Sequence, residues 1–190
     1  MTTVYFIRHA QPNYSNHCDE QRELTAKGME DRKLVTRFLA DKNVDMVLSS
    51  PFLRAVDTIR HFAEENDLPI TLIDGFRERR VDSVWIEDFM DFAQKQWEVF
   101  DYKLSDGECL AEVQKRQIAA LSDVLTRYEG KNIIVGSHGT AISTIIHYYV
   151  PGFGFEDFLE IRPKMPHIVE FQFDGQHCVR IRQHDLFPAP

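Results

Sequence analysis

The chain has 190 residues, of which 43% are hydrophobic, and it carries a formal net charge of −8 at pH 7. This length and apolar content are enough for one domain with a buried core, and the negative charge argues against a general nucleic-acid binder. The three cysteines lack framework spacing and no signal-peptide pattern occurs, which favours a cytoplasmic protein. No apolar stretch approaches the roughly 20 residues that a membrane span requires, so no membrane partner is predicted.

Strand-like runs alternate with helical patterns along the chain, which is typical of an α/β protein with a mostly parallel central sheet flanked by helices. The first strand-like run covers residues 4–7, a helix is predicted over 25–38, and a second strand-like run covers 46–48. Ser50-Pro51 is expected to open the next helix, because proline is tolerated at a first helical position. No repeat or interdomain linker interrupts the pattern, so residues 1–190 are predicted to form a single domain.

The second half of the chain continues this alternation. A capping box from Ser105 to Glu108 is expected to precede a helix that carries a mostly apolar stripe. A third strand-like run follows at 133–135. Near the end, Asp174-Gly175 lies between two strand-like runs and predicts a β-hairpin.

Three of the strand-like runs are followed by side chains that can bind or attack a phosphoryl group. Arg8 and His9 directly follow the first run, Arg54 comes soon after the second, and His138 comes soon after the third. Residues just past the carboxyl ends of strands in an open α/β sheet collect in one crevice. We therefore expect these four side chains to lie in one pocket.

Two arginines and two histidines suit phosphoryl transfer. The planar guanidinium of arginine binds phosphate oxygens bidentately and stays charged at any working pH. A neutral histidine can attack phosphorus through one ring nitrogen and form a covalent phospho-intermediate, while its other nitrogen needs an acceptor that fixes the tautomer. A lone histidine near a strand end is more often structural, but four polar residues at three strand ends are costly to place without a ligand.

These motifs resemble the histidine phosphatase superfamily, in the branch of phosphoglycerate mutase-like proteins. The resemblance rests on four motifs in the family's order: Arg8-His9-Ala10, the run from Leu24 to Gly28, the run from Ser49 to Ala55, and Ser137-His138-Gly139. It implies the phosphoglycerate mutase-like fold. It also implies that His9 is the nucleophile that becomes phosphorylated and that Arg8, Arg54 and His138 surround the phosphoryl group.

Three further residues are candidates for the site. Glu78 resembles the family's acidic residue that protonates the leaving oxygen, a role that needs a raised pKa. Ser15 falls by counting where the family often has a phosphate-contacting asparagine, and Asn13 or Asn16 could substitute for it. Gly139 opens a helix whose N-terminal amides can bind an anion, although a glycine there can also serve only the turn.

A metal site is the main chemical alternative for these histidines. It would use one of two groups of side chains: His17, Cys18 and Asp19, or His9, His138 and Glu78. No His-Glu-x-x-His or paired Cys-x-x-Cys motif occurs, and the nearby arginines would repel a divalent cation. No metal and no other cofactor is therefore predicted.

Residues 81–106 differ from the rest of the chain and are predicted to form a lid over the active site. Seven acidic residues stand in this segment against two lysines, and their field would oppose polyanionic substrates. Its aromatic residues, at helical spacing, are expected mostly to pack in the core, and some could line a leaving-group pocket. Just before the segment, Arg77, Arg79 and Arg80 are interpreted as solvated surface charges rather than phosphate ligands.

The predicted function is hydrolysis of a small phosphorylated metabolite, a phosphomonoester, through a phosphohistidine intermediate and without a metal. One alternative is a cofactor-dependent phosphoglycerate mutase, which must hold a doubly phosphorylated intermediate. The other is a noncatalytic protein that binds a phospho-ligand. The acidic lid and the short chain favour the hydrolase over the mutase, and the intact set of four site residues argues against the noncatalytic protein.

Overall fold

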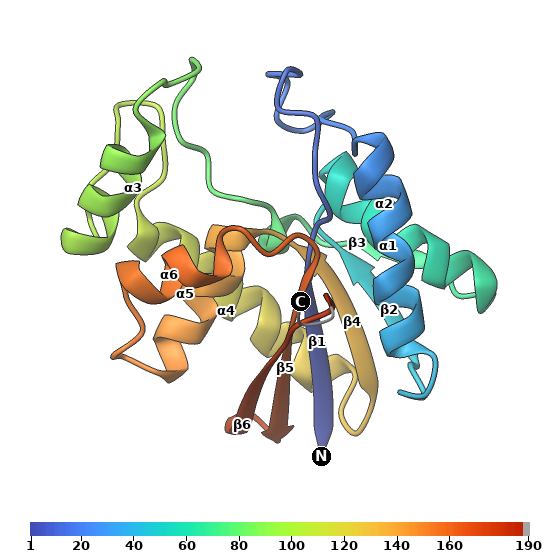
Figure 1. The fold of residues 1–190 in the computed structure, drawn as a ribbon. Helices are drawn as coiled ribbons and strands as arrows, with labels where there is room; N and C mark the ends of the chain where they lie inside the picture. The colour runs from blue at the N-terminus through green and yellow to red at the C-terminus, as the bar shows by residue number, and fades with distance from the viewer. Residues whose placement is uncertain (188–190) are drawn as a thin grey trace.

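Within residues 1–187, which the computed structural model describes, six strands form one sheet in the order β3-β2-β4-β1-β5-β6 (Figure 1). The strands are β1 (Thr2–Arg8), β2 (Met46–Ser49), β3 (Ile70–Leu72), β4 (Asn132–Ser137), β5 (His167–Asp174) and β6 (His177–His184). Strands β1 to β4 run parallel to one another. At one edge, β5 pairs antiparallel with β1, and β6 pairs antiparallel with β5. The predicted α/β fold with a mostly parallel sheet is confirmed. The predicted domain end at Pro190 lies outside the described residues.

Among the described residues there are six α-helices, five of which flank the sheet. They are α1 (Ala26–Leu39), α2 (Leu53–Glu65), α3 (Phe89–Glu98), α4 (Leu110–Arg127), α5 (Gly139–Tyr149) and α6 (Phe155–Ile161), with a short 3₁₀ turn, η1 (Asp74–Phe76), after β3. Figure 1 shows α1 and α2 on one side of the sheet and α4, α5 and α6 on the other. In the part of the chain that the structure describes, no helix is long and apolar enough to cross a membrane.

The layers explain why β1 reads as a continuous apolar run. Val4 and Phe6 pack into the core cluster shared with α4 and α5, whereas Tyr5 and Ile7 pack into the cluster shared with α1 and α2. Successive side chains of a strand point to opposite faces, and both faces of this sheet are covered. Alternation between polar and apolar residues is therefore absent from β1.

The predicted helix at 25–38 is confirmed with small changes at its ends. Thr25 is the N-cap of α1, and its side chain accepts a hydrogen bond from the backbone N–H of Gly28 at 3.0 Å. A Cβ at Gly28 would lie 2.3 Å from the carbonyl oxygen of Gln11, so the loop after β1 can approach the helix only because this residue is glycine. The predicted β-hairpin is confirmed, with Gly175 at φ +57° between β5 and β6.

Two predicted helix starts are wrong by a few residues. Helix α2 begins at Leu53, not at Ser50-Pro51. The capping box of α4 consists of Cys109 and Glu112, not of Ser105 and Glu108. Glu108 does not cap the helix, because its carboxylate binds the side chains of Arg77 and Arg116.

Residues 81–106 project beyond the sheet at the end where β1 terminates, together with the loop of residues 10–24 (Figure 1). The segment contains α3. Its aromatic residues mostly pack inward, as expected: Phe92 is buried, and Phe89 and Trp97 pack against the main core cluster. Trp85 is the exception, because its side chain is 51% exposed.

Candidate active site

The parallel pairing of β1 with β4 brings the two predicted histidines together. Arg8 stands opposite Ser137 in the register, and the backbone N–H of His9 donates to the carbonyl of Ser137 at 3.1 Å. The rings of His9 and His138 lie 5.4 Å apart, centroid to centroid. Adjacent β2 ends at Ser49, so that Ser50 reaches the same point of the sheet edge.

His9 is buried, and its ring is held in one tautomer. Its Nδ1 lies 2.8 Å from the carbonyl oxygen of Ala10. A carbonyl can only accept a hydrogen bond, so Nδ1 carries the hydrogen and Nε2 keeps its lone pair. The backbone N–H of Ala10 in turn donates to Thr58 Oγ1 at 2.9 Å, which fixes the acceptor. The acceptor that fixes the tautomer of His9, which the sequence could not reveal, is therefore the carbonyl oxygen of Ala10.

His138 is buried beside His9 and is held by Ser50. Its Nε2 lies 2.7 Å from Ser50 Oγ, which also accepts a hydrogen bond from the backbone N–H of Phe52 at 3.2 Å. The Ser50 hydroxyl can donate to Nε2 or accept from it, and when it donates, the hydrogen of the neutral ring lies on Nδ1. Within residues 1–187 this buried Nδ1 has no hydrogen-bond partner. Such an N–H can donate to an oxygen of a bound phosphoryl group.

Arg8 is anchored through one nitrogen of its guanidinium, whereas another nitrogen has no partner in the described part of the chain. Its Nη1 donates to three carbonyl oxygens at the end of α6, those of Ile161, Arg162 and Lys164, at 2.9, 2.6 and 3.2 Å. Its buried Nε has no partner among the described residues. A Cβ at Gly139 would lie 3.1 Å from this Nε, so glycine there makes room for the guanidinium. This packing supports a structural reason for Gly139, while its contact with phosphate stays a prediction.

Arg54 lies at the start of α2 and is linked through Asp19 to Arg22, a residue that the sequence analysis did not identify. Its Nη1 donates to the carbonyl oxygen of Asp19, and its Nη2 lies 3.0 Å from Asp19 Oδ1. The same carboxylate oxygen lies 2.9 Å from Nη1 of Arg22, whose side chain is also largely buried. Arg22 therefore adds a third guanidinium beside Arg54. It lies in an irregular polar loop, where no periodic pattern marks a residue as buried.

Glu78 lies at the N-terminus of α5. Its Oε2 accepts from the backbone N–H of Thr140 and its Oε1 from that of Ala141, each at 3.1 Å, and Oε1 also accepts from the N–H of Arg79 at 2.8 Å. These amides lie at the positive end of the helix dipole and hold the carboxyl group of Glu78 in place. The anion-binding position predicted at this helix is thus filled by Glu78. The side chain of Glu78 remains partly exposed.

Burial and neighbouring charges shape the titration of the histidines. Burial, together with the charges of Arg54 and Arg8, holds the pKa of His9 well below its ordinary value of 6.5. Burial and Arg54 act in the same direction on the pKa of His138. Burial lowers the pKa of Arg8 to about 10, so this guanidinium stays charged at neutral pH. A neutral nucleophile between positive charges is the state that attack on phosphorus requires.

We expect neither histidine to titrate near pH 6.5 in the folded protein. The unfolded chain binds protons at its ordinary histidine pKa while the native state does not, so stability is expected to decrease as the pH falls below 6.5. Ring ¹⁵N chemical shifts across a pH titration measure both pKa values directly, with His9→Ala and His138→Ala assigning the signals. A midpoint at or above 6.5 for His9 would contradict this account.

Comparison with known proteins agrees with this geometry. The family model of the histidine phosphatase superfamily, branch 1, matches residues 4–185. The chain belongs to this superfamily. Among curated relatives, the "Uncharacterized phosphatase PhoE" of Bacillus subtilis is 26% identical over 150 residues, which cover 77% of this chain and 76% of that protein. The "Probable phosphoglycerate mutase GpmB" of Enterobacter sp. is 27% identical over 164 residues, which cover 77% and 74%.

Solved structures of the histidine phosphatase fold superpose on almost the whole chain. Phosphoserine phosphatase from Entamoeba histolytica, in complex with 3-phosphoglyceric acid, aligns with a TM-score of 0.77 and 22% identity, covering 98% of this chain and 99% of that one. The predicted family and fold are therefore both confirmed.

The secondary phosphate contact predicted for this histidine phosphatase is not assembled around Ser15. Ser15 is exposed in a turn, where its backbone N–H donates to Asn13 Oδ1. The side-chain amides of Asn13 and Asn16 both donate to the carboxylate of Glu23, at 2.6 and 2.7 Å. These hydrogen bonds, from Asn16 and Asn13, lower the pKa of Glu23 to about 2. The amides of Asn13 and Asn16 are thus engaged by Glu23, and a phosphate contact by Ser15 stays a prediction.

The interpretation of Arg77, Arg79 and Arg80 as solvated charges is wrong for the first two. Arg79 is only 2% exposed, donates to Gln96 Oε1 and lies over the ring of Phe89. Arg77 forms a bidentate pair with Glu108. Only Arg80 is exposed as expected. Both arginines pair with residues far along the chain, so their charge alone did not indicate whether they would be exposed.

The candidate metal ligands of the loop have other partners. His17 stacks on Trp85 with ring centroids 4.1 Å apart, and Asp19 pairs with Arg22 and Arg54. Among the described residues no group of three or more metal-ligating side chains comes together. The stack joins the loop of residues 10–24 to the segment of residues 81–106.

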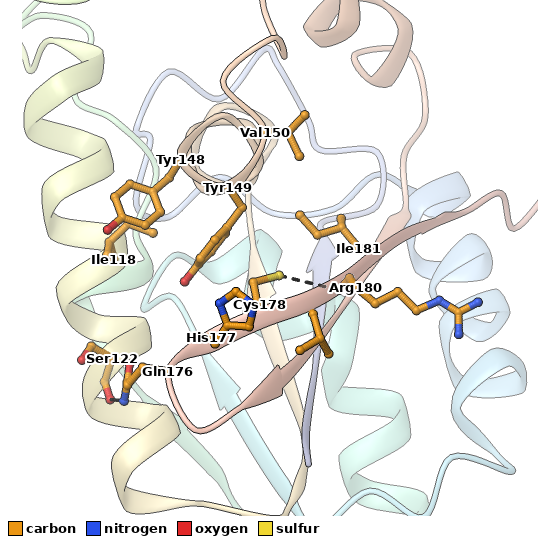
Figure 2. A pocket seen from close by; sticks show the side chains of 11 residues that line it. Ile118, Ser122, Tyr148, Tyr149, Val150, Gln176, His177, Cys178, Arg180 and Ile181 are labelled. Carbon is orange, nitrogen blue, oxygen red and sulfur yellow. Dashed lines mark hydrogen bonds between the residues drawn. The ribbon is translucent and has the colours of Figure 1, made fainter.

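A groove of about 750 Å³ lies elsewhere on the molecule, between α4, the end of α5 and the edge strand β6 (Figure 2). None of the predicted site residues lines it. Its nucleophile candidate is Cys178, whose Sγ lies 3.7 Å from the carbonyl oxygen of Arg180. Burial raises the pKa of Cys178 to about 11, so the thiol stays protonated at neutral pH. The thiol of Cys178 is therefore not an activated nucleophile.

Proposed function

We propose that this histidine phosphatase hydrolyses small phosphomonoesters through a phosphohistidine on His9. The observation that carries the proposal is the tautomer of His9. With Nδ1 bound to the carbonyl of Ala10, the lone pair of Nε2 is available for attack in a buried site that contains Arg8 and Arg54. Nucleophile and charge stabilisation thus stand together without further rearrangement.

The reaction has two steps. In the first, Nε2 of His9 forms a bond to phosphorus while the bond from phosphorus to the leaving oxygen breaks, and Glu78 gives that oxygen a proton. In the second, water attacks the phosphohistidine. Glu78 takes a proton from the water, the nitrogen–phosphorus bond breaks, and inorganic phosphate leaves with His9 restored. One general acid and base thus serves both steps.

Charge stabilisation comes from side chains rather than from a metal. Arg8 offers its Nε, unpartnered within residues 1–187, to the phosphoryl oxygens, Arg54 contributes a second guanidinium, and His138 donates from Nδ1. Arg22, beside Arg54, adds positive charge to the same region. Activity without a divalent ion and a cytoplasmic location both stay predictions.

The segment of residues 81–106 acts as a lid in this proposal. It reaches the loop of residues 10–24 through the stack of Trp85 on His17, and its acidic side chains are mostly exposed. Such a surface disfavours a bisphosphate, which a phosphoglycerate mutase must hold during reorientation. The named relatives include both phosphatases and a mutase, so the acidic lid is the observation that favours hydrolysis.

Product analysis separates these two activities. With 3-phosphoglycerate and catalytic 2,3-bisphosphoglycerate, we expect little 2-phosphoglycerate, whereas phosphoserine, 3-phosphoglycerate or other simple monoesters should release inorganic phosphate. Phosphorus NMR follows both products in one sample. Isomerisation that runs well ahead of phosphate release would contradict the hydrolase and favour the mutase.

A further inference from the structure

Glu108, directly before α4, gathers an unusual number of hydrogen bonds for one carboxylate. Oε1 accepts from Arg77 Nη2 and Arg116 Nε, both at 3.1 Å. Oε2 accepts from Arg77 Nη1 at 2.6 Å, from Arg116 Nη2 at 3.1 Å and from the backbone N–H of Arg80 at 2.9 Å. Burial alone would raise the pKa of Glu108, but the hydrogen bonds from Arg77 and Arg80 and the charge of Arg116 lower it overall. The carboxylate is therefore ionised at neutral pH.

The groups around Glu108 hold the backbone on both sides of Glu78. On one side, the carbonyl oxygen of Arg77 accepts from Arg116 Nη1 and from Gln117 Nε2, each at 3.0 Å. On the other side, Arg80 donates its N–H to Glu108 Oε2 and accepts, through its carbonyl oxygen, from the N–H of Glu108 at 2.8 Å. Glu78 thus lies between two backbone points that are fixed to the same carboxylate network.

This network is also the base of the lid. Beside Arg80 and Glu108, a Cβ at Gly107 would lie 2.2 Å from the carbonyl oxygen of Val81, so the two ends of the segment lie against each other. From inside the lid, Gln96 of α3 donates to the carbonyl oxygen of Glu108 at 2.9 Å and accepts from Arg79. The lid therefore leaves the core three residues after Glu78, and its far end returns at Gly107 beside Val81.

We infer that Glu108 is a positioning residue, which holds Glu78 where it can protonate the leaving group and ties that position to the base of the lid. This inference rests on the proposed function, in which Glu78 is the acid. The hydrogen bonds of the Glu108 carboxylate go to Arg77, Arg80 and Arg116 and not to His9. Its removal should therefore spare attack by His9 and weaken only the delivery of the proton.

Glu108→Gln tests this assignment, because glutamine keeps the shape of the side chain but loses the charge and one acceptor oxygen. An alkyl phosphate needs the proton of Glu78, whereas p-nitrophenyl phosphate hardly does. A positioned general acid is typically worth about 10²- to 10⁴-fold, so partial misplacement should lower kcat on the alkyl phosphate roughly tenfold more than on p-nitrophenyl phosphate. KM should change little on either substrate.

Two further variants complete the experiment. Glu112→Gln is the matched control, because Glu112 caps the same helix and binds Lys103. Relative to the wild-type protein, its kcat should change by the same factor on the two substrates. If Glu108→Gln fails to fold, Arg77→Met removes two of the five hydrogen bonds and should show the same selective loss. Equal losses on both substrates, or none, would overturn the positioning role. A wild-type protein that releases no phosphate from either substrate would instead overturn the proposed function, and the inference with it.

Discussion

Replacing His9 with alanine is expected to abolish phosphate release while the protein stays folded. Loss of the nucleophile of a covalent mechanism costs up to about 10⁶ in kcat, and we expect a fall of at least ~10³-fold on every monoester. The ring contributes one hydrogen bond, to the carbonyl of Ala10, so its removal should leave the sheet intact. Steady-state phosphate release measures the effect, and far-UV circular dichroism checks the fold.

His177→Ala is the matched control for this variant. His177 is an exposed histidine at the start of β6, and its replacement should leave phosphate release unchanged. If His9→Ala kept more than a tenth of the wild-type rate, another nucleophile would have to carry the reaction. His138 would then be the first candidate, because its ring lies 5.4 Å from that of His9.

The second large effect is expected from Glu78→Gln. Loss of a general acid should lower kcat on an alkyl phosphate by about 10²- to 10⁴-fold and on p-nitrophenyl phosphate by much less. The reason is that nitrophenolate is a good leaving group without protonation, whereas an alkoxide is not. Rates on a series of leaving groups measure the effect as a steeper dependence on the pKa of the leaving alcohol.

Asp82→Asn belongs in the same series, because Asp82 is the nearest acidic residue further along the chain. It is expected to show the wild-type dependence on the leaving group. If Asp82→Asn steepened the dependence and Glu78→Gln did not, Asp82 would be the acid. Glu78 would then serve only to cap α5 through the amides of Thr140 and Ala141.

The sequence was sufficient to predict where the reactive side chains gather. Arg8 and His9 directly follow one apolar run and His138 comes soon after another, and parallel strands carry such residues to one edge of the sheet whatever the loops do. Helical periodicity predicted α1, and the turn pair Asp174-Gly175 between two strand-like runs predicted the final hairpin. These features depend on local pattern and on a general rule of α/β topology, so one sequence reveals them.

Features that depend on contacts between distant loops could not be predicted in this way. Arg22 and Asp19 join Arg54 only after the loop of residues 10–24 folds over α2. Arg79 was expected on the surface, yet Gln96, 17 residues further along, and the rings of α3 bury it. The sequence pattern placed Glu108 in a capping box, but its carboxylate accepts hydrogen bonds from Arg77 and Arg116. Partner choice among charged residues is a tertiary property, which spacing along the chain does not encode.

Trapping the intermediate tests the central claim most directly. The wild-type protein is mixed with a ³²P-labelled monoester, quenched in base within milliseconds because phosphohistidine is labile to acid, and digested for mass spectrometry. We predict that the label lies on His9, at Nε2, and that it is absent from His9→Ala. Label on any other residue, or phosphate release from a wild-type protein that never carries label on His9, would contradict the account.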